Sequence, residues 1–170
     1  MRILVKTFAF LFLFVTAALA GSDKTAYIYT VCPRELVLSV ETNDVSSFMS
    51  LGKEVEVTGY FKMDEPSVLR IFDLLRNHLL VSVDTSKCSS SEYVTDDVVF
   101  NFYQYYLQVI PFYDGSARKV YVNAYMHDHN KDSSPERGFV WVLGGGAGYW
   151  SIIWNLEKNE FSNMIIHGSS

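Results

Sequence analysis

The chain has 170 residues, of which 49% are apolar, with 14 basic and 19 acidic residues. This length suits one domain, and the apolar fraction excludes an intrinsically disordered chain. The net charge of −5, without a basic cluster, argues against a nucleic-acid partner, because phosphate backbones are bound by lysine and arginine.

Residues 1–20 have the features of a signal peptide. Two basic residues precede an apolar run, Phe8–Val15, and Ala18-Leu19-Ala20 is the small-residue pattern that signal peptidase cleaves. The apolar run is too short to cross a hydrocarbon core of about 30 Å. We therefore expect residues 21–170 to form a single domain that is secreted or periplasmic, with no membrane insertion after the signal peptide is cleaved.

Two cysteines, Cys32 and Cys88, lie in the part of the chain expected to be exported. An oxidising compartment favours a disulfide between them, and closing so long a loop would add about 4 kcal/mol of stability. Two separate thiols are the alternative. The sequence has no Cys-x-x-Cys pair, which argues against a thioredoxin-like site or a zinc ribbon.

The N-terminal half predicts several strands followed by one helix. Alternating runs rich in β-branched residues indicate strands at 26–31, 35–42 and 53–62. A helical turn is expected at 45–49, and Asp64 can cap an amphipathic helix that would lie on the sheet. Residues 80–83 are expected to begin another extended segment. The apolar face of the helix is expected to contain Val68, Phe72, Leu75 and Leu79.

The C-terminal half is rich in β-forming residues. Its strands are expected at Val98–Tyr113, Arg118–His127, Phe139–Leu143, Tyr149–Leu156 and Phe161–His167. Asp114-Gly115 is a hairpin signal between the first two, and consecutive hairpins give an antiparallel meander. The predicted fold is therefore α+β: an antiparallel β-sheet, formed as a meander of hairpins, with one main amphipathic helix packed on one face.

A glycine cluster at 144–148 first suggests a phosphate-binding loop. It matches neither the dinucleotide fingerprint nor the P-loop pattern, and the residues after it predict a strand and not a helix. A glycine-rich hairpin, with positive φ angles or a close backbone approach, explains the cluster better. No cofactor is therefore expected.

The segment His127-Asp128-His129 is the most metal-like cluster of the chain. Imidazole and carboxylate groups suit zinc or copper, and His127 and His129 would share a face if the strand continues through them. The polar residues that follow favour a solvated loop as the alternative. Metal binding at these two histidines is therefore a secondary hypothesis.

Residue parity divides the side chains of the C-terminal strands between the two faces of the sheet. In the last strand, alternation would place Phe161, Asn163, Ile165 and His167 on one face, opposite Ser162, Met164 and Ile166. The face expected to pack on the helix contains Val120, Val122, Ala124, Trp150, Ile152 and Trp154. The opposite face would carry a mixed surface with the candidate binding residues Tyr121, Asn123, Tyr125, His127, Tyr149 and Asn155. The alternative is that this face is only partly exposed, or is covered by the N-terminal strands.

The last third of the chain has a distinctive order of elements. Tyr121–Tyr125 is followed by a polar loop, by the valine-rich stretch Phe139–Gly146 that ends in glycines, and by Asn155-Leu156 before a closing strand. Over residues 118–168 this order resembles a family of small exported bacterial proteins of unknown function. The resemblance implies export and a hairpin architecture, and it implies no activity. The chain departs from the family's pattern at Gly144, where an acidic residue is common.

These observations favour a protein that acts by binding and not by catalysis, with another protein or a cell-envelope component as its partner. The sequence has no Gly-x-Ser-x-Gly elbow and no cysteine-protease signature, so no catalytic residue is predicted. The alternatives are a small secreted hydrolase or metal-binding enzyme, and an inhibitor of a secreted enzyme.

Overall fold

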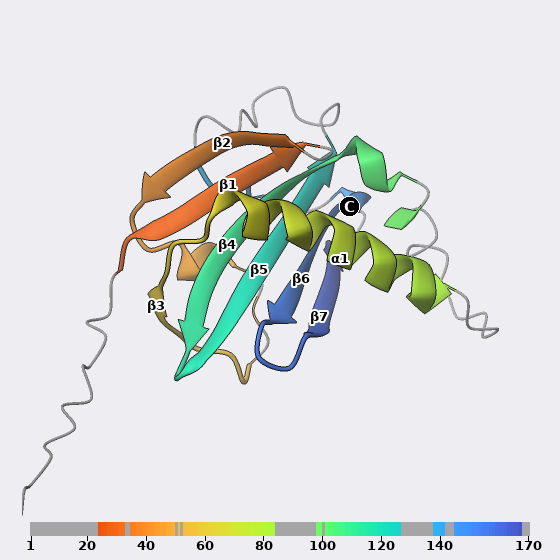
Figure 1. Cartoon of the computed structure of the whole chain (residues 1–170). Coiled ribbons are helices and arrows are strands. Elements are labelled where there is room, and N and C mark those ends of the chain that lie inside the picture. Colours follow the sequence, from red (N-terminus) through yellow and green to blue (C-terminus); the bar gives the residue numbers. More distant parts are fainter. Residues whose placement is uncertain are drawn as a thin grey trace, which may run out of the picture.

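The computed structural model describes residues 24–32, 35–49, 51, 53–83, 98–99, 101–126, 138–141 and 145–167. Its seven strands form one antiparallel sheet in the order β2-β1-β4-β5-β6-β7, and β3 pairs with β4. The strands are β1 (Ala26–Cys32), β2 (Glu35–Thr42), β3 (Val57–Tyr60), β4 (Tyr105–Asp114), β5 (Ala117–Met126), β6 (Gly146–Asn155) and β7 (Glu160–His167). Helix α1 (Glu65–Val83) lies across one face of the sheet (Figure 1). The α+β fold is thus confirmed.

Short connections explain why neighbouring strands pair. Asp114 pairs with Ala117 across the β4–β5 hairpin, and Gly115 has a φ of 59°, in the left-handed region that favours glycine and asparagine. The β6–β7 turn likewise contains Asn159, with a φ of 53°. The β1 and β3 strands pair with different parts of the same side of β4, β1 near Val109 and β3 near Tyr113.

Helix α1 starts where the sequence predicts. Asp64 accepts a hydrogen bond from the backbone N–H of Ser67 at 2.8 Å and so caps the first turn. The predicted apolar face is buried, and Ile71 joins it. The expected extended segment at 80–83 is wrong, because the helix continues through Val83. No glycine or proline stops it there, and adding valine to an existing helix costs only tenths of a kcal/mol, about 0.5.

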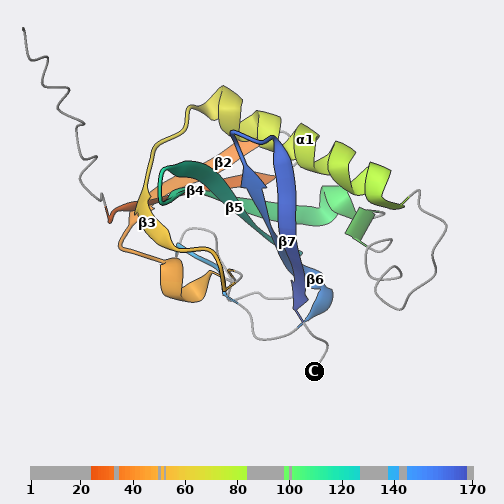
Figure 2. The same ribbon diagram turned by 90° about the horizontal axis from the view of Figure 1, so that it is seen from below.

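Aromatic rings fill the space between α1 and the sheet. Phe72 of the helix lies 4.8 Å from Phe102, which belongs to the 3-10 helix η2 (Phe102–Gln104), and Trp150 lies 5.5 Å from Tyr105. Figure 2 shows the helix running across the strands on this side. The burial of these aromatic rings explains why one helix is enough to cover this face of the sheet.

The strand register confirms the predicted division of faces in β5 and β6. Val122 pairs with Ile152 on the helix side, and Asn123 pairs with Ser151 on the opposite side, which we call the far face. The prediction for the last strand is wrong at Phe161, which stacks on Trp154 at 6.0 Å on the helix side. A β-bulge shifts the register, because Ser162 pairs with Ile153 but Ile165 pairs with Ser151.

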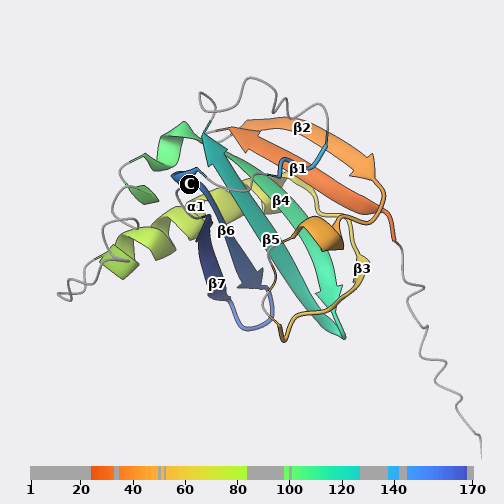
Figure 3. The ribbon, with the colours of Figure 1, turned by 180° about the vertical axis from the view of Figure 1, so that it is seen from behind.

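The far face is covered in part by two short segments (Figure 3). One is the 3-10 helix η1 (Ser46–Phe48), at the predicted helical turn. The other is residues 138–141, which we call the strap. Residues 139–141 lie in the segment predicted as the strand Phe139–Leu143, but they are not a strand in the structure. The reason is that buried side chains, and not a neighbouring strand, bind this backbone.

Cys32 carries a free thiol, so the predicted Cys32–Cys88 disulfide is not present in the structure. Its position at the end of β1 brings it against Tyr106 of β4. Cys88 itself lies outside the described residues, as do the predicted signal peptide at 1–20 and the histidines His127 and His129. Among the described residues, no helix is long and apolar enough to cross a membrane.

Candidate functional site

The strap is bound to the far face by two amide side chains. Gln108 of β4 donates from Nε2 to the carbonyl oxygen of Gly138 at 2.7 Å and accepts from the N–H of Val140 at 2.8 Å. Asn123 of β5 donates from Nδ2 to the carbonyl oxygen of Val140 at 2.7 Å and to Oε1 of Gln108 at 3.2 Å. Because amides carry both donors and acceptors, the pair replaces a strand as hydrogen-bond partner of the strap.

Most of the predicted binding residues are therefore buried. Tyr125 is stacked on Tyr106, with centroids 5.6 Å apart, and both pack with Val140 of the strap. Burial raises the pKa of Tyr125 above its ordinary value. Asn155 lies at the end of β6, where Oδ1 accepts the N–H of Lys158 in the turn. The structure buries Tyr121, Asn123, Tyr125 and Tyr149 on the one predicted face, and His127 lies outside the described residues.

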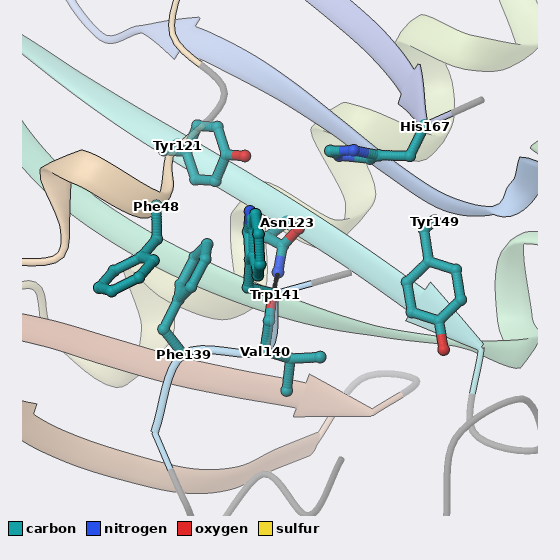
Figure 4. Close-up of a pocket in the computed structure, with 8 residues that line it drawn as sticks. All are labelled: Phe48, Tyr121, Asn123, Phe139, Val140, Trp141, Tyr149 and His167. Atoms are coloured by element: carbon teal, nitrogen blue, oxygen red, sulfur yellow. Dashed lines mark hydrogen bonds between the residues drawn. The ribbon is translucent and has the colours of Figure 1, made fainter. Parts of the chain in front are cut away.

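A hollow remains open at the side of the strap, and we call it the aromatic hollow (Figure 4). Its volume is about 220 Å³, including space open to solvent, and its enclosed part has room for about one water molecule. It brings together three predicted residues with five that the sequence did not indicate. The lining residues are Phe48, Tyr121, Asn123, Phe139, Val140, Trp141, Tyr149 and His167.

Two exposed aromatic rings form the rim of the aromatic hollow. Phe48 of η1 is 48% exposed and Trp141 of the strap is 52% exposed. Their centroids are 6.4 Å apart with the planes at 62°, and Phe139 lies 6.4 Å from Phe48 and 6.3 Å from Tyr121. An edge-to-face arrangement of this kind is favourable between rings. The rim is thus a corner of aromatic surface that is open to solvent.

The segment that carries Phe48 is held by a hydrogen-bonded turn. Asp44 accepts from the N–H of Ser46 at 2.9 Å and from Oη of Tyr60 at 2.6 Å. The Tyr60 hydroxyl in turn accepts from the N–H of Val45 at 3.2 Å. The Tyr60 hydroxyl lowers the pKa of Asp44, and burial raises the pKa of Tyr60. Phe48 is therefore presented by an ordered turn bound to β3.

Polar groups occupy the floor and the opposite wall of the hollow. Asn123 is 7% exposed, and its Nδ2 is used by the strap, whereas its Oδ1 accepts no hydrogen bond from the described residues. Figure 4 shows this oxygen pointing away from Val140, toward the side where Tyr121 and His167 face each other. Burial lowers the pKa of His167, so its imidazole is neutral near neutral pH.

The wall formed by Tyr149 depends on a glycine. Gly145 has a φ of 110°, and a Cβ atom there would lie 2.3 Å from Cδ2 of the Tyr149 ring. Gly146 has a φ of 56°. The predicted positive φ angles and close backbone approach are therefore confirmed at the described end of the glycine cluster. Gly145 leaves room for the tyrosine ring, and Gly146 is the first residue of β6.

Sequence reasoning missed Phe48, Phe139 and Trp141 for one reason and His167 for another. Parity assigns faces within strands, but the first three lie in a 3-10 turn and in the strap. His167 lies in β7, whose side chains parity groups without saying which group faces the helix. The sequence held little signal for Phe48, because a single apolar residue in a polar stretch is normal on a protein surface.

The described lining of the aromatic hollow carries no permanently charged side chain. None of these residues is an aspartate, glutamate, lysine or arginine. Among the described residues, no group of three His, Cys, Asp or Glu side chains could hold a metal ion. Comparisons of the chain with family models, with curated proteins and with solved structures gave no match. Ring stacking and hydrogen bonding are what these side chains offer a ligand.

Proposed function

We propose that the protein acts by binding, as an exported protein whose ligand site is the aromatic hollow. The observation that carries the proposal is the pair of half-exposed rings, Phe48 and Trp141, beside the Asn123 oxygen, to which none of the described residues donates. Ligand sites are typically concave, lined by aromatic side chains, and contain a few polar groups that orient the ligand. The hollow has this composition. The partner is a protein or a cell-envelope component that inserts a small group into it.

The supports of the hollow favour binding without large rearrangement. Phe48 is fixed through the Asp44–Tyr60 turn, and Trp141 is carried by the strap that Gln108 and Asn123 hold. A preorganised site loses less conformational entropy when a ligand binds. This supports a direct binding role for the two exposed rings.

The proposal is tested with N-phenyl-1-naphthylamine, a neutral aromatic dye whose fluorescence rises in apolar sites. Trp141→Ala and Phe48→Ala should each weaken binding of the dye about three- to tenfold, because each removes one aromatic contact. Tyr103→Ala is the matched control, since Tyr103 is also exposed but packs on Phe72 at the helix side. Equal affinities for all three variants and the wild-type protein would show that the hollow is not the binding site.

A further inference from the structure

We infer that the aromatic hollow binds a neutral sugar residue, stacked on Trp141 with one hydroxyl donating to Oδ1 of Asn123. The inference rests on the proposed function and names the ligand class of the same site. A sugar ring combines C–H faces with hydroxyl groups around its edge. The hollow offers an aromatic surface to the first and hydrogen-bonding groups to the second.

The charge of the hollow selects a neutral ligand. Among the described residues that line the hollow none is acidic, and the one base is His167, which burial keeps neutral near neutral pH. A phosphate, carboxylate or ammonium group entering the hollow would lose its hydration without gaining an opposite charge. Charged ligands are therefore disfavoured at this site.

The polar groups select a ligand that carries hydroxyls. Oδ1 of Asn123 faces the hollow and accepts no hydrogen bond from the described residues, so it is available to a hydroxyl donor. Tyr121 and His167 face each other across the same space (Figure 4). A ring stacked on Trp141 can place one hydroxyl toward the Asn123 oxygen. A purely aromatic ring would fill the apolar part and leave the Asn123 oxygen unpaired.

The enclosed part of the hollow takes only a small group. It has room for about one water molecule, which is the space that one hydroxyl group needs. The rest of the hollow is open to solvent, so the sugar ring itself would lie outside, on Trp141, and further sugars of a glycan can extend outward from it.

The test uses the full chain and a panel of neutral probes: the methyl glycosides of glucose, galactose and mannose, and N-acetylglucosamine. Binding is measured by saturation-transfer NMR and by titration of tryptophan fluorescence. Trp141 is the responsive group, because Trp150 and Trp154 are buried. We expect at least one of these glycosides to bind, and glucuronic acid, the charged analogue of glucose, to bind at least tenfold more weakly.

Variants assign the binding to the hollow. Trp141→Ala should weaken binding of the glycoside about tenfold and Trp141→Phe less, while Tyr103→Ala leaves it unchanged. Circular dichroism checks that each variant is folded. We expect folded variants, because the Trp141 and Tyr103 side chains are both exposed. A glycoside that binds Trp141→Ala as well as Tyr103→Ala overturns the inference.

The dye separates failure of the ligand class from failure of the site. If no glycoside binds but N-phenyl-1-naphthylamine still requires Trp141, the sugar assignment is wrong and the hollow remains a site for an aromatic group of a protein partner. If neither the glycosides nor the dye depends on Trp141, both the ligand class and the proposed function are wrong.

Discussion

At the scale of single residues, one side chain serves two purposes on the far face. Asn123 donates its amide hydrogens to Val140 and Gln108, and these bonds hold the strap. Its oxygen is left over and faces the aromatic hollow. Gln108 is fully buried, and both its amide nitrogen and its amide oxygen bond to the strap. Parity placed Asn123 on the correct face. Only its contacts show that the amide nitrogen holds the strap, while the oxygen is left for the hollow.

We expect Gln108→Met to lower the free energy of unfolding by about 1–3 kcal/mol. The substitution keeps the length of the side chain but leaves the carbonyl oxygen of Gly138 and the N–H of Val140 without their partner. Urea unfolding followed by circular dichroism measures the change.

The control for this variant is Gln104→Met. Gln104 is exposed, and among the described residues its side chain bonds to Asn101 alone, at 3.0 Å, so its replacement should change stability by less than about 0.5 kcal/mol. Equal losses in the two variants would show that the strap does not depend on Gln108.

At the scale of elements, agreement with the sequence depends on regularity. In helix α1 and in strands β5 and β6 the side chains lie on their predicted faces. The period of 3.6 residues holds along the helix, and the period of 2 holds along each strand. In β7 the bulge near Asn163, whose φ is 54°, breaks the period and moves Phe161 to the helix side. The strap has no period of its own, and its hydrogen bonds come from distant side chains.

The start of β6 provides a test of the glycine requirement. Gly145→Ala and Gly115→Ala both force alanine into a positive φ, which costs about 1–2 kcal/mol at Gly115 and more at Gly145, where φ is 110° and lies outside the left-handed region. Only at Gly145 does the new Cβ also meet the buried Tyr149 ring, whereas nothing lies within 4 Å at Gly115. Gly145→Ala should therefore be less stable than Gly115→Ala by about a further 1–3 kcal/mol.

Thermal and urea unfolding of the two variants measure this difference directly. Adding Tyr149→Ala to Gly145→Ala should remove part of the additional loss, since the obstructing ring is then absent. A difference near zero between the two alanine variants would mean that Tyr149 moves aside without cost.

At the scale of the whole molecule, two histidines make stability depend on pH. Burial lowers the pKa of His78, whose ring lies 4.7 Å from Phe161, and the pKa of His167 in the hollow. Both groups take up a proton more readily in the unfolded chain, where the pKa is about 6.5. The free energy of unfolding should therefore be highest above that pH and should decrease as the pH falls from 7.5 to 5.5.

The double variant His78→Gln, His167→Gln should show a smaller decrease over the same interval, measured by urea unfolding at each pH. The carboxyl groups of Asp44 and Asp114 have lowered pKa values because hydroxyl and ammonium groups bond to them. Their contribution is lost only below about pH 4, where the unfolded carboxyl groups titrate, so it does not interfere. An unchanged slope in the double variant would contradict this account.

By itself, the sequence determined the α+β class, the apolar face of α1 and the division of β5 and β6 between two faces. These follow from the spacing of residues that are neighbours along the chain, and spacing is a local property. Only the tertiary structure decided that the far face is covered, that Cys32 is a free thiol, and that Phe48, Trp141 and His167 meet around one hollow. Those outcomes depend on contacts such as that of Gln108 with Val140, 32 positions apart, for which no local period exists.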